Sequence, residues 1–362
     1  MSRMDEEKVI VLTGGGTSGH VTPNIALKPY LEREGFSICY IGSRNGIEKE
    51  LILKEGIPYY EISAGKLRRY FDVKNFTDVF RVVTGFLQAY TLLGRLKPCV
   101  VFSKGGFVSC PVVWAAWMRR IPVIIHESDI TPGLTNKLSM PFAKAVCYTF
   151  PETERYIPEG KGIKTGIPIR QCLLEGDRRT GRSICGFRDA KPVLMVIGGS
   201  LGSENINNAV RSVLDRLLKD FNVCHICGKG NIKKELNGIN GYKQFEYVNE
   251  EQPHLFALAD LVLSRAGATV LFELLALKKP NLLIPLSRAA SRGDQILNAA
   301  SFEKQGYSKV LTEENLDSGS LIHAIYDLWN NAERYTASMK KGTGDSGVQA
   351  VISTIMRYAD KR

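Results

Sequence analysis

The sequence contains no apolar run long enough to cross a lipid bilayer. Its longest apolar runs, such as Val112–Met118 and Val193–Ile197, have the length of a strand, whereas a membrane-spanning helix needs ~20 residues. The N-terminal residues up to Lys8 are mainly charged and polar and lead directly into an apolar strand, so no signal peptide is recognisable. We therefore expect a soluble, intracellular protein.

A disulfide framework and a metal-binding motif are absent as well. The eight cysteines are scattered along 362 residues without a repeated spacing, which is typical of proteins in a reducing compartment. No Asp-x-Asp pair occurs, and neither a Ser-His-Asp nor a Cys-His arrangement has a supporting motif. We expect neither a bound metal nor another cofactor.

Positive charge is the one skewed quantity. The 48 Lys and Arg residues exceed the 37 Asp and Glu residues, which gives a formal net charge of +11. Nucleic acid, an anionic membrane surface and a phosphorylated substrate all fit that sign. Because no recognition-helix, OB-fold or RRM signature is present, we expect no nucleic-acid partner.

Short apolar runs alternate with longer amphipathic stretches, which predicts an α/β fold with parallel sheets. The candidate strands are Val9–Leu12, Ser37–Ile41, Cys99–Ser103, Val123–His126, Ala145–Cys147, Val193–Gly198, Asn222–Ile226, Leu261–Ser264 and Asn281–Pro285. The candidate helices include Pro23–Glu34, Thr77–Leu96, Ser203–Leu218 and Val270–Leu277. At about 150 residues per domain, the length predicts two domains.

The same opening occurs twice in the chain. The strand Val9–Leu12 runs into a glycine-rich turn and a helix, and Val193–Ile197 does the same. Such a turn begins the first βα unit of a doubly wound domain, so we expect two of them, with a linker between Glu152 and Asp189. Ligands of these folds bind at the carboxyl ends of the strands, which predicts a site in a cleft between the two domains.

The first glycine loop, Gly14 to His20, has backbone amides suited to phosphate. No acidic residue follows the second strand to bind a ribose, and no Lys-Ser/Thr completes a P-loop, so a tight packing turn explains the glycines equally well. His20 follows the loop in the first helical turn. It is either a general base or a structural histidine.

The second glycine loop, Gly198–Gly202, repeats this design, which predicts two substrates or a diphosphate and its acceptor, unless both loops are packing turns. The segment Ser264–Glu273 ends a strand and opens a helix whose first amides can hold a sugar nucleotide, with Glu273 on ribose hydroxyls. An ordinary βα turn is the alternative. Gln295 and Asn298 share a helix face and can bind sugar hydroxyls, or they belong to a surface loop.

Basic and aromatic residues are mixed between Lys66 and Leu87, and again between Trp114 and Arg120. Aromatic side chains surrounded by Lys and Arg suit a membrane interface with anionic headgroups. Helices packed on the core with solvated basic ends explain the pattern equally well.

Taken together, these segments resemble the MurG glycosyltransferases. The similarity runs in order from about residue 8 to residue 310. Its segments are Gly15–Pro23, Ser103–Phe107, His126–Asp129, Gly133–Lys137, Thr165–Arg170, Gly198–Ser200, Arg265–Glu273 and Asp294–Ala299.

The resemblance implies the α/β GT-B fold, with two doubly wound Rossmann-like domains facing an inter-domain cleft. Residues 1–165 would form an N-terminal domain for acceptor and membrane, and residues 166–344 a C-terminal domain for UDP-GlcNAc. A helix over residues 345–362 would pack back onto the first. Members of the family move N-acetylglucosamine from UDP-GlcNAc, with inversion, to the 4-hydroxyl of the muramoyl sugar of undecaprenyl-linked lipid I. The product is lipid II, the peptidoglycan precursor, and no metal-binding Asp-x-Asp is needed.

The resemblance also implies roles for single residues. His20 is the family's cleft histidine, a candidate for activating the acceptor hydroxyl. The residues implied to bind UDP-GlcNAc are Thr17, Ser18 and Gly19 near the donor sugar and diphosphate, Arg170, Gly199 and Ser200 at the diphosphate or sugar, Val248 at the uracil, Ala268, Thr269 and Glu273 around the nucleoside, and Gln295 and Asn298 on the GlcNAc hydroxyls. Two positions depart from the family pattern. The family often has Asn where this chain has Asp129, and it commonly has glycine where this chain has Ser18.

A lipid-linked acceptor stays in the bilayer, so the resemblance implies a peripheral protein on the cytoplasmic face of the cell membrane. The residues expected to contact that surface are Arg68, Arg69, Phe76, Phe80 and Phe86, together with the Trp114–Arg120 segment. Cell-wall synthesis proteins are further expected partners. Two alternatives stay open: a related glycosyltransferase with a diacylglycerol acceptor, and a non-catalytic nucleotide-binding scaffold of the cell-wall machinery.

Overall fold

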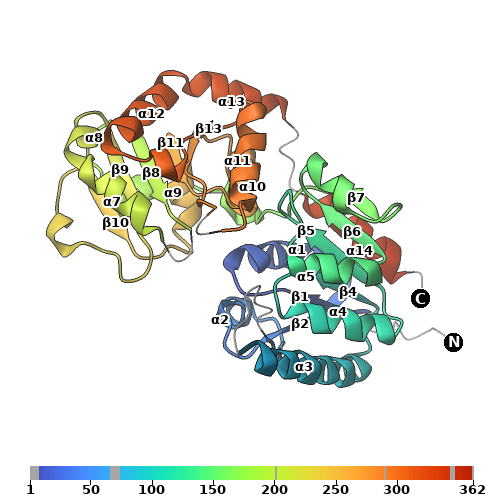
Figure 1. The fold of residues 1–362 in the computed structure, drawn as a ribbon. Coiled ribbons are helices and arrows are strands. Elements are labelled where there is room, and N and C mark those ends of the chain that lie inside the picture. Colours follow the sequence, from blue (N-terminus) through green and yellow to red (C-terminus); the bar gives the residue numbers. More distant parts are fainter. Residues whose placement is uncertain (1–7, 66–73, 200–201, 289–290, 343–346, 361–362) are drawn as a thin grey trace. The chain divides into compact units, whose positions relative to one another are not determined.

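The computed structural model describes residues 8–65, 74–199, 202–288, 291–342 and 347–360, and for residues 74–79 only the backbone. The chain divides into two compact units (Figure 1). The N-terminal unit comprises Met1–Arg170 and Ser346–Arg362, and the C-terminal unit comprises Gln171–Asp345. The unit boundary therefore lies at residue 170, inside the stretch where the sequence predicts a linker.

The N-terminal unit contains a parallel sheet with strand order β3-β2-β1-β4-β5-β6-β7. Its strands are β1 (Lys8–Thr13), β2 (Phe36–Ser43), β3 (Tyr59–Ile62), β4 (Val100–Ser103), β5 (Val123–Glu127), β6 (Ala145–Tyr148) and β7 (Gly162–Lys164). The order reverses between β1 and β4, where Thr13 pairs with Ser103, so the carboxyl ends of these strands are level. That reversal is the usual ligand-binding point of a doubly wound sheet.

Helices cover both faces of this sheet because its strands are apolar on both sides. Ile10 and Leu12 of β1 pack in one core cluster, whereas Val11 packs in the other, as the alternation of side chains in a strand requires. The helices are α1 (Thr22–Arg33), α2 (Ile47–Lys54), α3 (Lys74–Leu96), α4 (Ser109–Met118), α5 (Leu134–Ser139) and the C-terminal α14 (Val348–Ala359).

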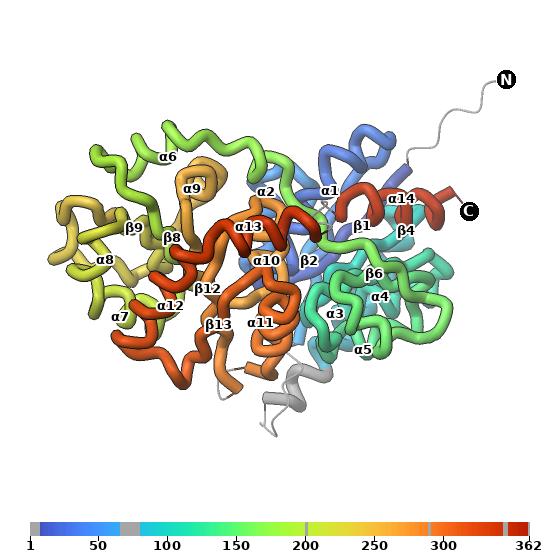
Figure 2. The backbone as a smooth tube through the Cα atoms, turned by 90° about the horizontal axis from the view of Figure 1, so that it is seen from above, coloured from blue at the N-terminus to red at the C-terminus, as the bar shows by residue number. Residues whose placement is uncertain are grey.

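Helix α14 belongs to the N-terminal unit although it ends the chain. It packs beside α1, as Figure 2 shows, and Val351 and Ile355 are buried in the same core cluster as Leu27. The Gly347 N–H donates to the Ile167 carbonyl oxygen at 3.0 Å, which fixes the start of this helix.

The C-terminal unit repeats the design with a six-stranded parallel sheet of order β10-β9-β8-β11-β12-β13. Its strands are β8 (Val193–Ile197), β9 (Asn222–Ile226), β10 (Tyr242–Phe245), β11 (Leu261–Ser264), β12 (Asn281–Leu283) and β13 (Lys309–Val310). Its helices are α6 (Arg178–Cys185), α7 (Glu204–Ser212), α8 (Leu214–Asp220), α9 (Gln252–Leu258), α10 (Ala268–Leu277), α11 (Asp294–Lys304), α12 (Ser318–Asn330) and α13 (Ala332–Lys341). The strand order reverses between β8 and β11.

Two doubly wound α/β units with parallel sheets confirm the predicted fold class. All nine predicted strands are present, but the predicted Ser203–Leu218 helix is divided into α7 and α8 at Val213. The sequence prediction missed the edge strands β3, β7, β10 and β13, which are short and only partly apolar. Among the described residues, no helix combines the length and apolar character required to cross a membrane.

Candidate active site

The first glycine loop touches the loop that follows β4 and contains Gly105 and Gly106. The Gly15 N–H donates to the Gly105 carbonyl oxygen at 3.2 Å, and the Lys104 N–H donates to that of Thr13 at 2.8 Å. A Cβ atom on Gly106, which has a φ of +86°, would lie 2.1 Å from the Gly15 oxygen. Position 106 therefore requires glycine, both for its left-handed backbone and for the close approach of the two loops.

His20 lies at the end of η1 (Ser18–His20), the short 3-10 helix that follows the first loop. The imidazole is partly exposed, and its Nδ1 atom lies 3.0 Å from the main-chain oxygen of Lys104. A carbonyl oxygen only accepts hydrogen bonds, so Nδ1 carries the proton and Nε2 carries the lone pair of the neutral ring. In this tautomer His20 can take up a proton at Nε2.

A buried ammonium group lies at the carboxyl end of β4. The Lys104 residue is 1% exposed, and its Nζ donates to the Ser128 hydroxyl. Burial lowers the pKa of Lys104 to about 8, although the charges of Glu127 and Asp129 oppose that effect. The ammonium is therefore mainly protonated at neutral pH and lies in the field of two carboxylates.

Glu127 holds the loop that follows β5. Its buried carboxylate accepts hydrogen bonds from the N–H groups of Asp129 (3.0 Å) and Gly133 (3.1 Å) and from Asn136 Nδ2 (2.8 Å). Burial, and then the nearby charge of Asp129, raises the pKa of Glu127. Asp129 is partly exposed, so it is the carboxylate of this pair that a ligand can reach.

Glu48 holds the first glycine loop through a hydrogen bond to its backbone, a role that the sequence did not indicate. Its side chain is completely buried, and one carboxylate oxygen accepts the Gly16 N–H at 3.2 Å. The other oxygen accepts the N–H and the hydroxyl of Ser43, at 3.1 and 2.5 Å. A Cβ atom on Gly15 would lie 2.6 Å from this carboxylate, which explains why the loop needs glycine there.

In the C-terminal unit, the amides of Gln295 and Asn298 hold the turn between β11 and α10. Gln295 Oε1 accepts the N–H groups of Ala266 (3.3 Å) and Leu286 (3.1 Å), so it joins the loops after β11 and β12. Asn298 Nδ2 donates to the Ala266 carbonyl oxygen at 3.3 Å, and the residue is completely buried. The structure thus gives both side chains a supporting role, and their contact with sugar hydroxyls stays a prediction.

Helix α10 presents its N-terminus at this edge of the sheet. It begins at Ala268 and Thr269 after Gly267, which caps the helix without a side-chain hydrogen bond. Backbone N–H groups of a first helical turn are suited to an anionic ligand. Glu273 lies further along the same helix and is buried, as is Val248 in the loop after β10.

Arg265 and Glu313 form a buried ion pair beside that turn, and the sequence prediction included neither as a site residue. Arg265 Nη2 lies 2.6 Å from Glu313 Oε1, and the two side chains are 9% and 10% exposed. Arg265 directly precedes Ala266, and Glu313 opens η6 (Glu313–Asn315). A sequence signal existed only for Arg265, which lies inside a motif of the resemblance.

The predicted site residues fall into two groups, one in each unit. The N-terminal unit contains Thr17, Ser18, Gly19, His20, Asp129 and Arg170, and the C-terminal unit contains Gly199, Val248, Ala268, Thr269, Glu273, Gln295 and Asn298. Ser200 lies outside the described residues. In both units these residues lie in segments that follow the carboxyl ends of strands. Residues 17–20 follow β1, Gly199 follows β8, and the start of α10 follows β11, which are strands at the reversal points. The remaining residues follow other strands, namely Asp129 after β5, Arg170 after β7, Val248 after β10, and Gln295 and Asn298 after β12.

The predicted membrane contact is only partly described. Arg68 and Arg69, and the side chain of Phe76, lie outside the described residues. Phe80 on α3 is 63% exposed, but Phe86 is half-buried against the core and stacks with Tyr90. Phe86 thus packs partly against the core of the N-terminal unit, and its contact with a membrane stays a prediction.

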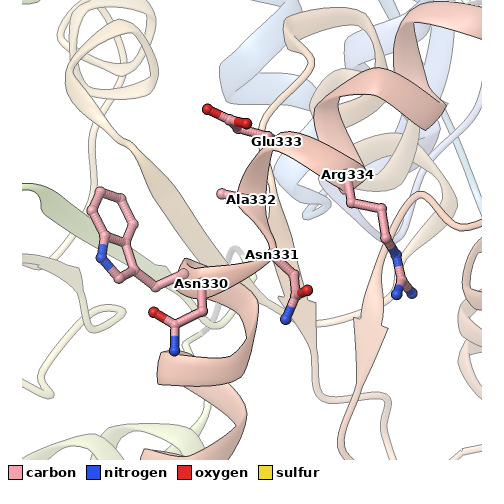
Figure 3. Close-up of a pocket in the computed structure, with 6 residues that line it drawn as sticks. Asn330, Asn331, Ala332, Glu333 and Arg334 are labelled. Carbon is pink, nitrogen blue, oxygen red and sulfur yellow. The ribbon is translucent and has the colours of Figure 1, made fainter.

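One surface pocket lies at the turn between α12 and α13 and includes Asn331 and Arg334 (Figure 3). Its lining comes from six consecutive residues, none of which belongs to the predicted site. In the part of the chain that the structure describes, no cluster of three or more His, Cys, Asp or Glu side chains is arranged to hold a metal ion.

Comparison with known proteins likewise finds two domains in the chain. Residues 10–148 match the model of the glycosyltransferase family 28 N-terminal domain, and residues 193–355 match that of the family 28 C-terminal domain. A Clostridium perfringens protein named UDP-N-acetylglucosamine–N-acetylmuramyl-(pentapeptide) pyrophosphoryl-undecaprenol N-acetylglucosamine transferase is 58% identical over 97% of this chain and 98% of its own length. The protein of the same name from Clostridium tetani is 56% identical over the same shares.

The fold is also found in a solved structure. The crystal structure of Acinetobacter baumannii MurG superimposes with a TM-score of 0.75 at 24% identity, covering 97% of this chain and 99% of that one. The two matched domains and the full-length relatives place this chain in glycosyltransferase family 28, and within it the chain belongs to the MurG glycosyltransferases.

Proposed function

We propose that this protein transfers N-acetylglucosamine from UDP-GlcNAc to the 4-hydroxyl of the muramoyl sugar of undecaprenyl-linked lipid I, which gives lipid II. The observation that carries the proposal is the similarity, over nearly the full length of both chains, to relatives whose name states this transfer. The same observation disfavours a diacylglycerol acceptor and a non-catalytic scaffold. The protein is accordingly a hexosyltransferase of peptidoglycan synthesis.

His20 is the proposed general base. Its Nδ1 proton is held by the Lys104 carbonyl oxygen, so Nε2 takes the proton of the acceptor hydroxyl. The hydroxyl oxygen then forms a bond to the anomeric carbon of the donor sugar from the face opposite the diphosphate. The bond between that carbon and the diphosphate oxygen breaks, UDP leaves with the electron pair, and the configuration inverts.

The C-terminal unit is the proposed donor site. The first backbone N–H groups of α10, at Ala268 and Thr269, would face the negative charge that develops on the departing diphosphate. Arg170 adds a permanent positive charge for the same group. Glu273 is proposed at the ribose, Val248 at the uracil, and Gln295 and Asn298 at the GlcNAc hydroxyls. Thr17, Ser18, Gly19, Gly199 and Ser200 are further residues proposed to bind the donor.

The transfer is tested with labelled UDP-GlcNAc, a lipid I analogue and, separately, a diacylglycerol acceptor. We expect product only with lipid I, and a loss of at least ~100-fold in kcat in His20→Ala, as removal of a general base predicts. His323→Ala, an exposed histidine on α12, serves as the matched control. Transfer to diacylglycerol alone would refute the acceptor, and unchanged kcat in His20→Ala would refute the base.

We also propose that an exposed apolar stripe on α3 binds the cytoplasmic face of the membrane and keeps the protein at its lipid-linked acceptor. Phe80, Val83 and Leu87 are each more than half exposed and follow one another at helical spacing. Trp117 and Met118 of α4 are similarly exposed. The adjoining Arg119 guanidinium lies 3.9 Å from the ring centre of Tyr90, which adds a cation suited to anionic headgroups.

Flotation with anionic and neutral vesicles tests this surface. We expect Phe80→Ser combined with Leu87→Ser to abolish binding to anionic vesicles, because both changes remove exposed apolar area without touching the core. Leu53→Ser on α2, also 51% exposed, is the control and should bind normally. Equal binding by all three proteins would show that α3 is not the contact.

A further inference from the structure

The guanidinium of Arg265 joins three loops of the C-terminal unit. Nη1 donates to the Ile284 carbonyl oxygen after β12 at 3.1 Å. Nη2 donates to the Ser203 hydroxyl before α7 at 2.7 Å and to Glu313 Oε1 at 2.6 Å. Arg265 itself lies in the loop after β11, so one side chain connects the segments that follow β8, β11, β12 and β13.

The carboxylate of Glu313 extends the same network. Oε1 also accepts Asn205 Nδ2 at 2.9 Å, and Oε2 accepts the Ser287 N–H at 3.1 Å. Although burial alone would raise the pKa of Glu313, hydrogen bonds from Arg265, Asn205 and Ser287 leave that pKa below its ordinary value. The carboxylate is therefore ionised at neutral pH and neutralises the guanidinium beside it.

These contacts leave Arg265 poorly suited to bind an anion directly. Its charge is compensated by Glu313, the residue is 7% exposed, and both N–H bonds of Nη2 are used within the protein. The next residue along the chain is Ala266, whose N–H and carbonyl oxygen are held by Gln295 and Asn298. The contacts therefore end two residues before α10, whose first turn is where the donor diphosphate is proposed to bind.

We propose that Arg265 and Glu313 form a buried clamp that positions the donor-nucleotide loops, and that both act as positioning residues rather than as ligands of the diphosphate. The inference rests on the proposed UDP-GlcNAc site. The clamp fixes the loops after β8, β11 and β12 in one arrangement before the nucleotide binds, so less order has to be created on binding. Replacing either partner leaves the other buried charge uncompensated and releases the loops.

The test compares wild type with Glu313→Gln, which keeps the shape but removes the charge, and with the milder Asn205→Ala. We expect Glu313→Gln to raise the Kd for UDP and the KM for UDP-GlcNAc about tenfold, with kcat at saturating donor and the KM for the lipid acceptor within about twofold. Asn205→Ala should shift the same two constants by a smaller factor. Hydrogen exchange at the Ser287 amide should accelerate in Glu313→Gln.

Asp260→Asn is the matched control. Asp260 forms a two-pronged pair with Arg178 at 2.9 Å and accepts the Val193 N–H at 2.8 Å, at the amino end of the same sheet. This variant should lose thermal stability while its Kd for UDP stays unchanged.

The clamp is overturned if Glu313→Gln and Asn205→Ala bind UDP like wild type, or if kcat and both KM values change together as they would in a partly unfolded enzyme. Failure of the wild type to bind UDP would overturn the proposed function instead, and unaltered exchange at Ser287 would still refute the clamp separately.

Discussion

The Nδ1 atom of His20 lies 3.0 Å from the main-chain oxygen of Lys104, and this contact decides which nitrogen of the imidazole is basic. The oxygen belongs to the residue that directly follows β4, whereas His20 follows β1. The two meet because β1 and β4 are paired neighbours at the reversal of strand order. The pairing of the strands thus orients the proposed base through a main-chain oxygen.

Gly106→Ala should disturb this arrangement. The added Cβ would lie 2.1 Å from the Gly15 oxygen, and the position has a φ of +86°, so the loops must separate. We expect kcat/KM to fall by ~10- to 100-fold, because a misplacement of about 1 Å in a catalytic group can cost about 100-fold. Steady-state kinetics measure the effect. Gly56→Ala, with a φ of +70° and no atom near the added Cβ, should retain its activity.

Glu48→Gln should loosen the first glycine loop from below. Glu48 accepts from Gly16 on one oxygen and from Ser43 on the other, and a carboxamide has only one oxygen for these two sites. The N–H of either Gly16 or Ser43 then faces an NH₂ group, which costs roughly 1–3 kcal/mol. Urea unfolding and kcat/KM should both report the loss. The exposed Glu50→Gln on the same helix should leave both at wild-type values.

Lys104→Met should remove a pH dependence of stability. The pKa of Lys104 in the folded protein, about 8, is below its ordinary value of 10.5, so the ammonium destabilises the fold at low pH and this cost fades as the pH rises from 8 to 10.5. The shift in the pKa from 10.5 to about 8 corresponds to about 3 kcal/mol in the free energy of unfolding, which wild type regains between these two pH values. Urea titrations across this range should show wild type gaining stability relative to Lys104→Met. Parallel curves would contradict the prediction, and the exposed Lys137→Met should follow wild type.

Glu313, unlike Lys104, should stabilise the folded protein at neutral pH and lose this contribution in acid. Its pKa is lowered in the folded protein, so its contribution is present above the unfolded pKa of about 4.5 and is lost as the pH falls through the lower folded value. We expect the difference in unfolding free energy between wild type and Glu313→Gln to be full at pH 7 and to shrink below pH ~4.5. Thermal unfolding between pH 3 and 7 measures it. A difference that stays constant over this range would show that the carboxylate is not the group responsible.

Much of the fold follows from local pattern. Val193–Ile197 and Val100–Phe102 are continuous apolar runs of strand length, which are typical of strands covered on both faces. The edge strands β7 and β13 could not be predicted in this way, since only one side of each pairs with a neighbour and their side chains are partly exposed. Their strand conformation depends on the neighbour that is already in place.

The residues of the candidate site also fall into those that local sequence predicts and those that only the folded chain brings together. The sequence by itself determined the two glycine turns, His20 and the start of α10, because each is a short motif whose chemistry is local. Only the tertiary structure decided that Glu48 lies under Gly16, that Lys104 orients His20, and that Glu313 neutralises Arg265. These partners are 32, 84 and 48 residues apart, and it is the parallel pairing of strands that brings their loops together at one edge of a sheet.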